Sequence, residues 1–272
     1  MGALEMFIHG GIDVFGDAVG ATSAATMGIN GTDPISSAAA GAGIGSTIKS
    51  VLHEFANRML SDREKKRINA FSELVIEQIS IRLSRGKKIR DDGFFDKIRN
   101  RSNAEEIFEG ITLVAKKEYV EDKIPLLANL YAYIAFESSI SRERAHQLIT
   151  LAEMLSYQQL ELIKIVCDAK NNAFVLKIRN DQSLSPQNQP LFADIFLIYR
   201  MSIVHSNSVF LDFANVNPAS LMPTQLAIDL YRGMDLFTLD SESIPNNIIN
   251  EMGKYVFATG TEEVNNIYYT LK

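Results

Sequence analysis

Residues 36–50, SSAAAGAGIGSTIKS, place three glycines at alternate positions ahead of a Ser-Thr pair and a lysine, a composition that could cradle a phosphate. A phosphate-binding P-loop needs its lysine directly after the last glycine, where the ammonium group reaches the β- and γ-phosphates. Here Ser-Thr-Ile separates Gly45 from Lys49. The dinucleotide fingerprint G-x-G-x-x-G also fails, because Gly41, Gly43 and Gly45 give G-x-G-x-G without a preceding strand. The spacing therefore favours close helix packing over nucleotide binding.

The remaining residue types that carry chemistry do not form a recognised site. The His-Glu pair at 53–54 lacks the second histidine of H-E-x-x-H, and the other histidines are scattered. Glu105, Glu106 and Glu109 form a carboxylate cluster, although acidic residues in a first helical turn are the commoner explanation. Cys167 lies in an apolar helical segment, which favours a core role over a nucleophile. We therefore predict a protein that is not an enzyme and has no metal, cofactor or small-molecule substrate.

A basic segment with interleaved aromatic residues, 85–101, could bind nucleic-acid phosphates and offer stacking faces. Its cations and rings are Arg85, Lys87, Lys88, Arg90, Lys97, Arg99 and Arg101, with Phe94 and Phe95. Three aspartates dilute this charge, and a solvated loop, or one paired with acids of another subunit, would use the same residues. Nucleic-acid binding is therefore the alternative interpretation.

The net charge of −6 hides a strong asymmetry. Residues 58–101 hold thirteen Lys and Arg against seven Asp and Glu, so the rest of the chain is strongly acidic. From Leu191 onward there are nine acidic and four basic residues, whereas a DNA-reading module is expected to be basic. This part is predicted to pack or to contact protein.

Cysteine content and hydropathy bear on location. A single cysteine excludes an internal disulfide and fits a reducing compartment. The first fourteen residues contain no Lys or Arg, so we expect no secretory signal, and no apolar run approaches the about 18 residues of a membrane span. The prediction is a cytoplasmic protein that could associate with a membrane on activation.

Composition divides the chain into three predicted domains. Residues 1–48 hold ten of the sixteen glycines and no Lys or Arg, and the turn signal at 30–34 predicts a hairpin of two small-residue helical arms, or an irregular packed coil. Residues 49–155 predict a helical bundle, and 156–272 a winged-helix-like module. The predicted fold is therefore mostly α, a helical bundle with a small C-terminal α/β winged-helix-like part.

Local signals place the elements of the bundle. Ser46 could cap a helix whose inner stripe runs from Ile48 to Met59, and Ser61 and Ser102 each begin a capping box with a glutamate three residues later. The segment 126–136 is apolar nearly all round, which predicts a central buried helix.

Strand-like and helical segments alternate in the C-terminal part. Residues 173–179 and 208–213 are rich in Val, Ile and Phe and predict strands. The segment 190–204 predicts a helix leading towards a strand, and Met222 starts another helix that ends at Gly233.

The small-residue zone suggests how the protein could assemble. Glycines allow helices to approach closely, both in lipid and between copies of a protein. The candidates for membrane or self-assembly packing are Gly16, Gly20, Gly28, Gly41 and Gly45. The short arms carry Ser, Thr and Asn, and the acidic flanks would be repelled by anionic lipid.

Three stretches together resemble the bacterial abortive-infection alpha family. They are VEDK running into IPLLANLYAYIA, the segment LITLAEMLSYQQLELIKIV, and LIYRMSIV followed by VFLDF and LMPTQLAIDLYRGM. The last departs from the family pattern, because its Thr and Pro are exchanged and Ala227 replaces a glycine. The resemblance covers about residues 100–235, implies a role in phage defence, and carries over no catalytic residues.

These observations lead to one expectation and one alternative. We expect a non-enzymatic bacterial defence protein that acts by self-assembly or membrane disturbance, with a homo-oligomer or a protein as its partner. The alternative is a nucleic-acid-binding regulator that uses residues 85–101.

Overall fold

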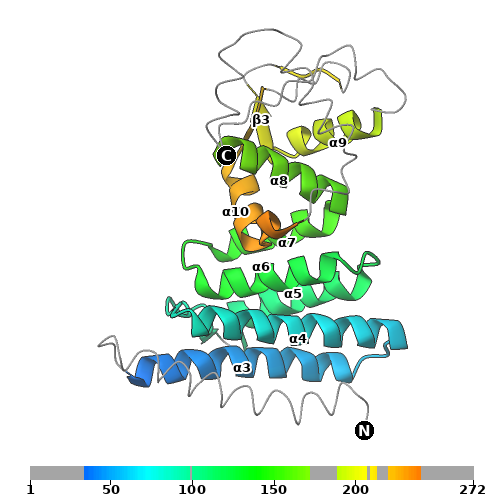
Figure 1. Ribbon diagram of the computed structural model, residues 1–272. Helices are drawn as coiled ribbons and strands as arrows, with labels where there is room; N and C mark the ends of the chain where they lie inside the picture. Colours follow the sequence, from blue (N-terminus) through cyan, green and yellow to red (C-terminus); the bar gives the residue numbers. More distant parts are fainter. Residues whose placement is uncertain (1–33, 99, 172–188, 207–208, 213–219, 240–272) are drawn as a thin grey trace. The chain divides into compact units, whose positions relative to one another are not determined.

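The computed structural model describes residues 34–98, 100–171, 189–206, 209–212 and 220–239 (Figure 1). The chain divides into two compact units. The first comprises Met1–Met154 with Gly233–Asp235, and the second comprises Leu155–Arg232 with Leu236–Lys272. The described residues are mostly helical, as predicted, and they include two small two-stranded sheets.

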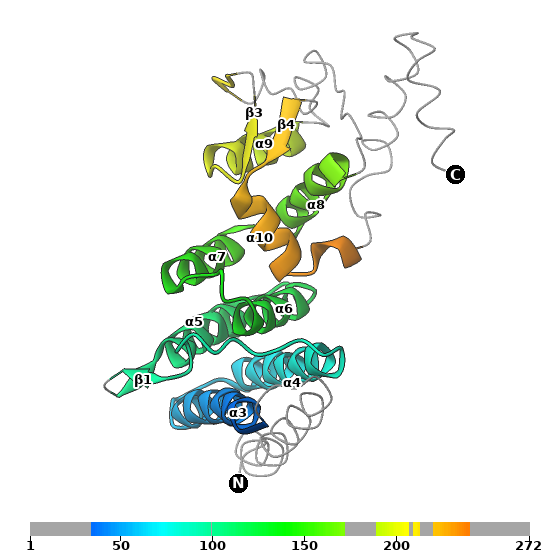
Figure 2. The same ribbon diagram turned by 90° about the vertical axis from the view of Figure 1, so that its left-hand side faces the viewer.

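The first unit is built from antiparallel helices. Its described elements are α3 (Pro34–Ala56), α4 (Asp62–Ser84), β1 (Lys97–Ile98), β2 (Arg101–Ser102), α5 (Asn103–Lys117), α6 (Lys123–Phe136) and α7 (Arg142–Met154). Helix α4 packs on α5 and α6, while α5 also packs on α3 and α7. Figure 2 shows α3 to α6 nearly end-on, with the β1–β2 hairpin projecting to one side. Helix α5 therefore lies in contact with every other described helix of this unit.

The core of the first unit is centred on α6 and on the aromatic side chains around it. Leu127, Leu130 and Tyr131 are fully buried, which confirms the prediction of a central buried helix. The Phe108 ring of α5 lies 4.8 Å from the Tyr131 ring and 5.9 Å from the Phe71 ring of α4, measured between ring centroids. This row of rings joins three helices.

Both predicted capping boxes form. The Ser61 hydroxyl accepts from the Glu64 N–H, and the Glu64 carboxylate accepts from the Ser61 N–H at 2.8 Å. Ser102 and Glu105 exchange the same two bonds at the start of α5, at 3.1 and 2.9 Å. Each box satisfies backbone donors that the first turn of a helix leaves without partners.

Helix α3 differs from the prediction at both of its ends. Ser46 is not an N-cap, because the helix already begins at Pro34 and the Ser46 hydroxyl donates back to the Gly43 carbonyl at 3.3 Å. The predicted inner stripe is buried from Ile48 to Phe55, whereas Met59 is fully exposed because the helix ends at Ala56. One helix thus runs across the predicted boundary at residue 48.

The second unit combines helices with one short strand pair. Its described elements are α8 (Tyr157–Asn171), α9 (Gln189–Arg200), β3 (Val204–Ser206), β4 (Leu221–Pro223), α10 (Gln225–Gly233, whose last residue belongs to the first unit) and the 3-10 turn η5 (Leu236–Thr238). β3 and β4 are antiparallel, with Val204 opposite Pro223. The predicted helix leading into a strand is confirmed, and so is the helix ending at Gly233, although it begins at Gln225 and the predicted start, Met222, lies in β4.

The predicted strands fare differently. The segment 173–179 lies outside the described residues. In the described part of 208–213 no strand forms, so that prediction is wrong there. Val209 and Leu211 are 79% and 80% exposed, so neither has the buried face that favours a strand. The partner of β3 is β4 instead, and the Thr224 N–H fixes this pairing by donating to the Ile203 carbonyl at 3.1 Å.

Among the described helices, none is both long enough and apolar enough to cross a membrane.

Candidate functional site

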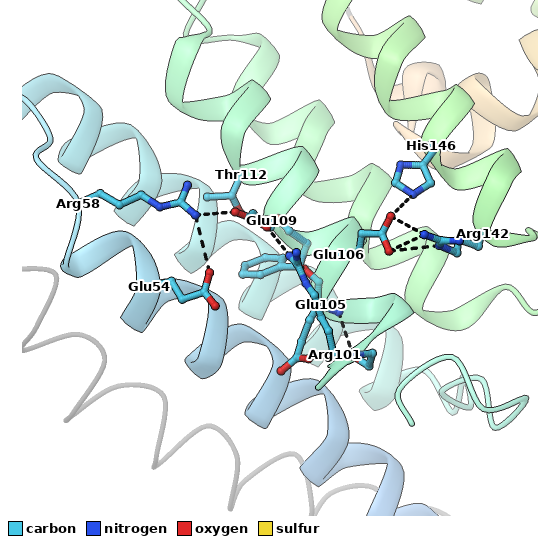
Figure 3. Close-up of polar contacts among 11 residues, drawn as sticks. Glu54, Arg58, Arg101, Glu105, Glu106, Glu109, Thr112, Arg142 and His146 are labelled. Atoms are coloured by element: carbon cyan, nitrogen blue, oxygen red, sulfur yellow. Dashed lines mark hydrogen bonds and ion pairs between the residues drawn. The ribbon is translucent and has the colours of Figure 1, made fainter. Parts of the chain in front are cut away.

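The predicted carboxylate cluster lies on one helix of the first unit and contacts three other elements (Figure 3). We call Glu105, Glu106 and Glu109 of α5 the carboxylate row. Their ion-pair partners come from the segment that follows α3, from the β1–β2 hairpin and from α7. Arg58 is 51 residues from Glu109 and Arg142 is 36 residues from Glu106, so only the fold brings these two cations to the row.

Glu109 is shared by two arginines. The Arg58 Nη2 atom lies 2.6 Å from Glu109 Oε1, and Arg101 Nη2 donates to the other carboxylate oxygen. Arg58 follows the end of α3 and Arg101 lies in β2, so one carboxylate joins two elements to α5. Burial raises the pKa of Glu109, but the hydrogen bonds from Arg58 and Arg101 outweigh burial and hold it below its ordinary value.

Glu106 joins α5 to α7 through a cation and an imidazole. Arg142 donates to Glu106 from Nη2 at 2.8 Å and from Nε at 3.2 Å, a bidentate arrangement. His146 Nε2 lies 2.8 Å from Glu106 Oε1. Burial raises the pKa of Glu106, yet the hydrogen bonds from Arg142 and His146 lower it overall.

Glu105 is the most buried member of the row. Its carboxylate caps Ser102 and lies 3.4 Å from the Lys97 Nζ atom, and only 5% of its side chain is exposed. Burial raises the pKa of Glu105, but the hydrogen bonds from Ser102 and Ser50 and the charge of Lys97 lower it overall. The capping role was predicted, whereas the contact with Lys97 was not.

The chemistry open to the carboxylate row follows from these partners. A general acid needs a raised pKa, and all three carboxyls have lowered ones. A histidine oriented by a carboxylate is half of a catalytic base arrangement, and His146 with Glu106 has that geometry. Within the described residues, the hydrogen bond of the His146 ring is to Glu106, which also binds Arg142. The row is therefore built to hold elements together.

Acid lability is the first testable consequence of the carboxylate row. The folded-state pKa values lie below the ordinary glutamate value of 4.5, so below about that pH the unfolded chain binds more protons than the folded one. We expect stability to be complete above about pH 4.5 and to fall as the pH drops. Glu64, which caps α4 and lies outside the row, adds to this acid lability, because hydrogen bonds from Ser61 lower its pKa to about 2.

Denaturant unfolding followed at a series of pH values measures this decline. Glu109→Gln should flatten the acid side of the stability curve, because the uncharged amide cannot gain a proton there. Glu73→Gln, at an exposed position of α4 outside the row, is the matched control. Parallel curves for wild type and Glu109→Gln would contradict the interpretation.

The basic segment 85–101 divides into engaged and exposed cations. Arg90 is buried and donates to the carbonyls of Ile134 at 3.2 Å and Ile140 at 2.9 Å. Arg101 and Lys97 are paired with the carboxylate row, and Arg99 lies outside the described residues. Among the described cations of this segment, Arg85, Lys87 and Lys88 are exposed and form no ion pair with another described residue.

The two aromatic residues of the segment also pack inward. Phe94 is 3% exposed, and the Arg90 guanidinium lies 4.2 Å from the centre of its ring. Phe95 packs against α3, where a Cβ added at Gly43 would lie 3.2 Å from the Phe95 Cβ. Neither arrangement is the open stacking face that the nucleic-acid interpretation expects of these rings.

The predicted packing glycines lie partly outside the description. Gly16, Gly20 and Gly28 are outside the described residues, while Gly41 and Gly45 are in α3, with Gly45 buried. Gly43, one of the three alternate glycines whose spacing favoured close packing, makes the close contact seen with Phe95. Part of the small-residue face thus packs within the same chain.

Sequence reasoning missed two charged arrangements. The pairing of Glu106 with Arg142 and His146 links positions on different helices and has no local signal. The buried ion pair between Glu118 and Lys123 spans the turn before α6, where the acidic stretch suggested only a helix start.

Neither a metal site among the described residues nor a similarity to known proteins adds to this picture of the carboxylate row. In the described ranges, no group of three His, Cys, Asp or Glu residues is arranged to hold a metal ion. No protein-family model, curated protein or solved structure matches this chain, and the resemblance to the abortive-infection alpha family therefore stays a prediction.

Proposed function

We propose that this chain is a non-enzymatic defence protein of the abortive-infection type that acts by self-assembly or by disturbing a membrane. The observation that carries the proposal is the two-part character of α3. Its first part, Pro34–Gly43, contains no charged residue and two of the three glycines of the helix. Its second part carries a buried apolar stripe and is followed by Arg58, which is bound to Glu109.

The burial of apolar side chains indicates which part of α3 is fixed to the rest of the first unit. Ile48, Leu52 and Phe55 are fully buried, and burying each such side chain contributes about 1.5–3 kcal/mol. Removing this part of the helix from α5 would cost a large share of a stability that is only about 5–15 kcal/mol. The second part of α3 is therefore the fixed base, and the uncharged part that precedes it is the effector.

The carboxylate row supports the non-enzymatic class. Each of its members is already bound by at least one cation and holds a neighbouring element. The second unit fits a supporting role in this proposal. The order α8, α9, β3–β4 and α10 is compatible with a winged-helix-like module, and its acidic surroundings favour protein over DNA as a partner.

A charge placed in the uncharged part of α3 tests the proposal. We expect the full-length protein to release dye from lipid vesicles and to arrest bacterial growth when expressed. Ala40→Lys should lower leakage markedly, because its charge must be buried among lipid chains when this part enters the membrane, at a cost of up to about 2.5–3.5 kcal/mol. Ser46→Lys, at an exposed position of the anchored part, is the matched control.

Two results decide between modes of action. Equal melting temperatures of the variants and the wild type would show that the lysine acts on the membrane step rather than on folding. Concentration-dependent oligomers without leakage would favour the self-assembly mode, whereas the absence of leakage, growth arrest and oligomers together would refute the proposal. A bulky residue at Gly43 is a poorer test, since its contact with Phe95 would disturb the fold itself.

The second candidate function, nucleic-acid binding, is favoured by one specific observation. Arg85, Lys87 and Lys88 are exposed together where α4 ends. Their place at a helix C-terminus also has a simple electrostatic explanation, since cations are stabilised there. A gel shift that weakens with salt and is lost in a Lys87→Ala/Lys88→Ala variant would favour this candidate over the first.

A further inference from the structure

Three large apolar side chains are exposed at one end of the first unit. Met59 is 104% exposed in the turn between α3 and α4, Tyr119 is 83% exposed in the turn between α5 and α6, and Met154 is 63% exposed at the end of α7. Single exposed apolar residues are common on protein surfaces, but apolar residues that gather on one face indicate a contact site.

Ion pairs show that the helix ends carrying these three residues are adjacent. Lys117, two residues before Tyr119, lies with its Nζ atom 3.6 Å from Glu153 Oε1, beside Met154 in sequence. Lys116 Nζ lies 3.3 Å from Glu64 Oε1. Glu64 is in the first turn of α4, the helix that follows Met59. Figure 1 shows the α3–α4 and α5–α6 turns at the same end of the helices. We call Met59, Tyr119 and Met154 the turn surface.

Charges of both signs flank the turn surface. Arg63 and Lys66 are exposed in the first two turns of α4, and Glu121 and Asp122 are exposed just before α6. Across the described ranges, none of these four has a recorded ion pair. A two-fold axis through the turn surface would bring the basic side of one copy against the acidic side of the other.

We infer that the turn surface binds a second copy of this chain in a two-fold symmetric contact centred on Tyr119 and Met59. Tyrosine, methionine and arginine are enriched in protein interfaces. The turn surface contains the first two types, and Arg63 flanks it. The inference rests on the proposed function, because it names the contact through which self-assembly would begin.

Sedimentation velocity on the full-length protein over a range of concentrations tests the contact. We expect a monomer–dimer equilibrium in the wild type. Tyr119→Asp should weaken dimerisation at least about tenfold, because central aromatic residues carry much of the binding energy of an interface. Ile98→Asp is the matched control, since Ile98 is 66% exposed on the β1–β2 hairpin, away from the turn surface.

A charge-reversal pair tests the two-fold arrangement. Lys66→Glu should weaken the dimer through repulsion by Glu121 and Asp122 of the second copy, and adding Asp122→Lys should restore it. A wild type that stays monomeric at every concentration, or equal losses in Tyr119→Asp and Ile98→Asp, would overturn the inference. A Tyr119-dependent dimer in a wild type without leakage or growth arrest would support the contact and count against the defence role alone.

Discussion

Replacing Arg90 by alanine is expected to lower the free energy of unfolding by about 3–5 kcal/mol, because two backbone carbonyls lose their charged donor and each buried polar group left unsatisfied costs about 1–3 kcal/mol. The guanidinium donates from Nη1 to two backbone carbonyls, those of Ile134 near the end of α6 and Ile140 in the following loop. Its Nε atom donates to Asp92 Oδ1 at 2.8 Å. The side chain is 4% exposed, so water cannot replace these bonds.

The loss arises mainly from the groups that Arg90 would leave behind. The last carbonyls of a helix have no partners within the helix, and Arg90 supplies one for the end of α6. The Arg90 N–H also donates to the Ala135 carbonyl at 3.2 Å, so the whole residue ties the loop after α4 to this helix end. Hydrogen bonds from Arg90 lower the pKa of Asp92, which shows that the carboxylate depends on its partner.

Urea unfolding of three variants separates the causes. Arg90→Lys keeps the charge but cannot donate to both carbonyls and bind Asp92 in a planar fork, so it should remain strongly destabilising. Lys88→Ala, at an exposed position two residues away, should change stability by less than about 0.5 kcal/mol. A loss below about 1 kcal/mol for Arg90→Ala would contradict the interpretation that Arg90 holds the loop after α4 against the end of α6.

Local signals in the sequence were sufficient for the helices of the first unit. The capping boxes at Ser61 and Ser102 fix helix starts through contacts three residues apart, and the apolar segment 126–136 can only be accommodated by burial on all sides. The uninterrupted course of α3 through Ser46 was missed because glycine lowers helix propensity, and packing against α5 and Phe95 overrides that preference.

The partners in the candidate site could not be predicted from local patterns. Arg90 and Arg101 belong to one basic segment in the sequence, yet one is buried under helix carbonyls and the other is bound to Glu109. Nothing in the spacing of cations distinguishes a buried arginine from an exposed one. A useful signal was the aromatic residue Phe94 close to Arg90 in the sequence, since its ring covers the Arg90 guanidinium.

The turn between α5 and α6 contains the second residue pair with a large expected effect. Lys123 Nζ lies 2.6 Å from Glu118 Oε2, and the two side chains are 4% and 7% exposed. The other carboxylate oxygen of Glu118 accepts from the N–H groups of Tyr119 and Val120, each at 3.0 Å. The pair therefore closes the turn and neutralises two buried charges at once.

Breaking this pair from one side should be costly. Lys123→Met leaves the Glu118 carboxylate buried without its cation, and Glu118→Gln leaves the Lys123 ammonium buried without its anion. Removing one partner of a buried ion pair costs about 3–5 kcal/mol, mainly through the charge that remains. Glu118→Gln keeps an oxygen for the two N–H groups, so its loss should be the smaller of the two.

The double variant Glu118→Gln/Lys123→Met is expected to be more stable than either single variant, because it removes both charges and leaves an uncharged amide to accept from the turn. In a double-mutant cycle, the double variant should lose at least about 2 kcal/mol less than the sum of the single losses. The exposed pair of Asp62 with Lys65, 3.9 Å apart, is the control, and Lys65→Ala should cost less than about 0.5 kcal/mol. Additive losses in the cycle would mean that the two residues stabilise the turn separately. In 1 M salt, the interaction energy of Glu118 with Lys123 from the cycle should stay unchanged, whereas any energy of the Asp62–Lys65 pair should fall. Salt screens buried charges far less than exposed ones.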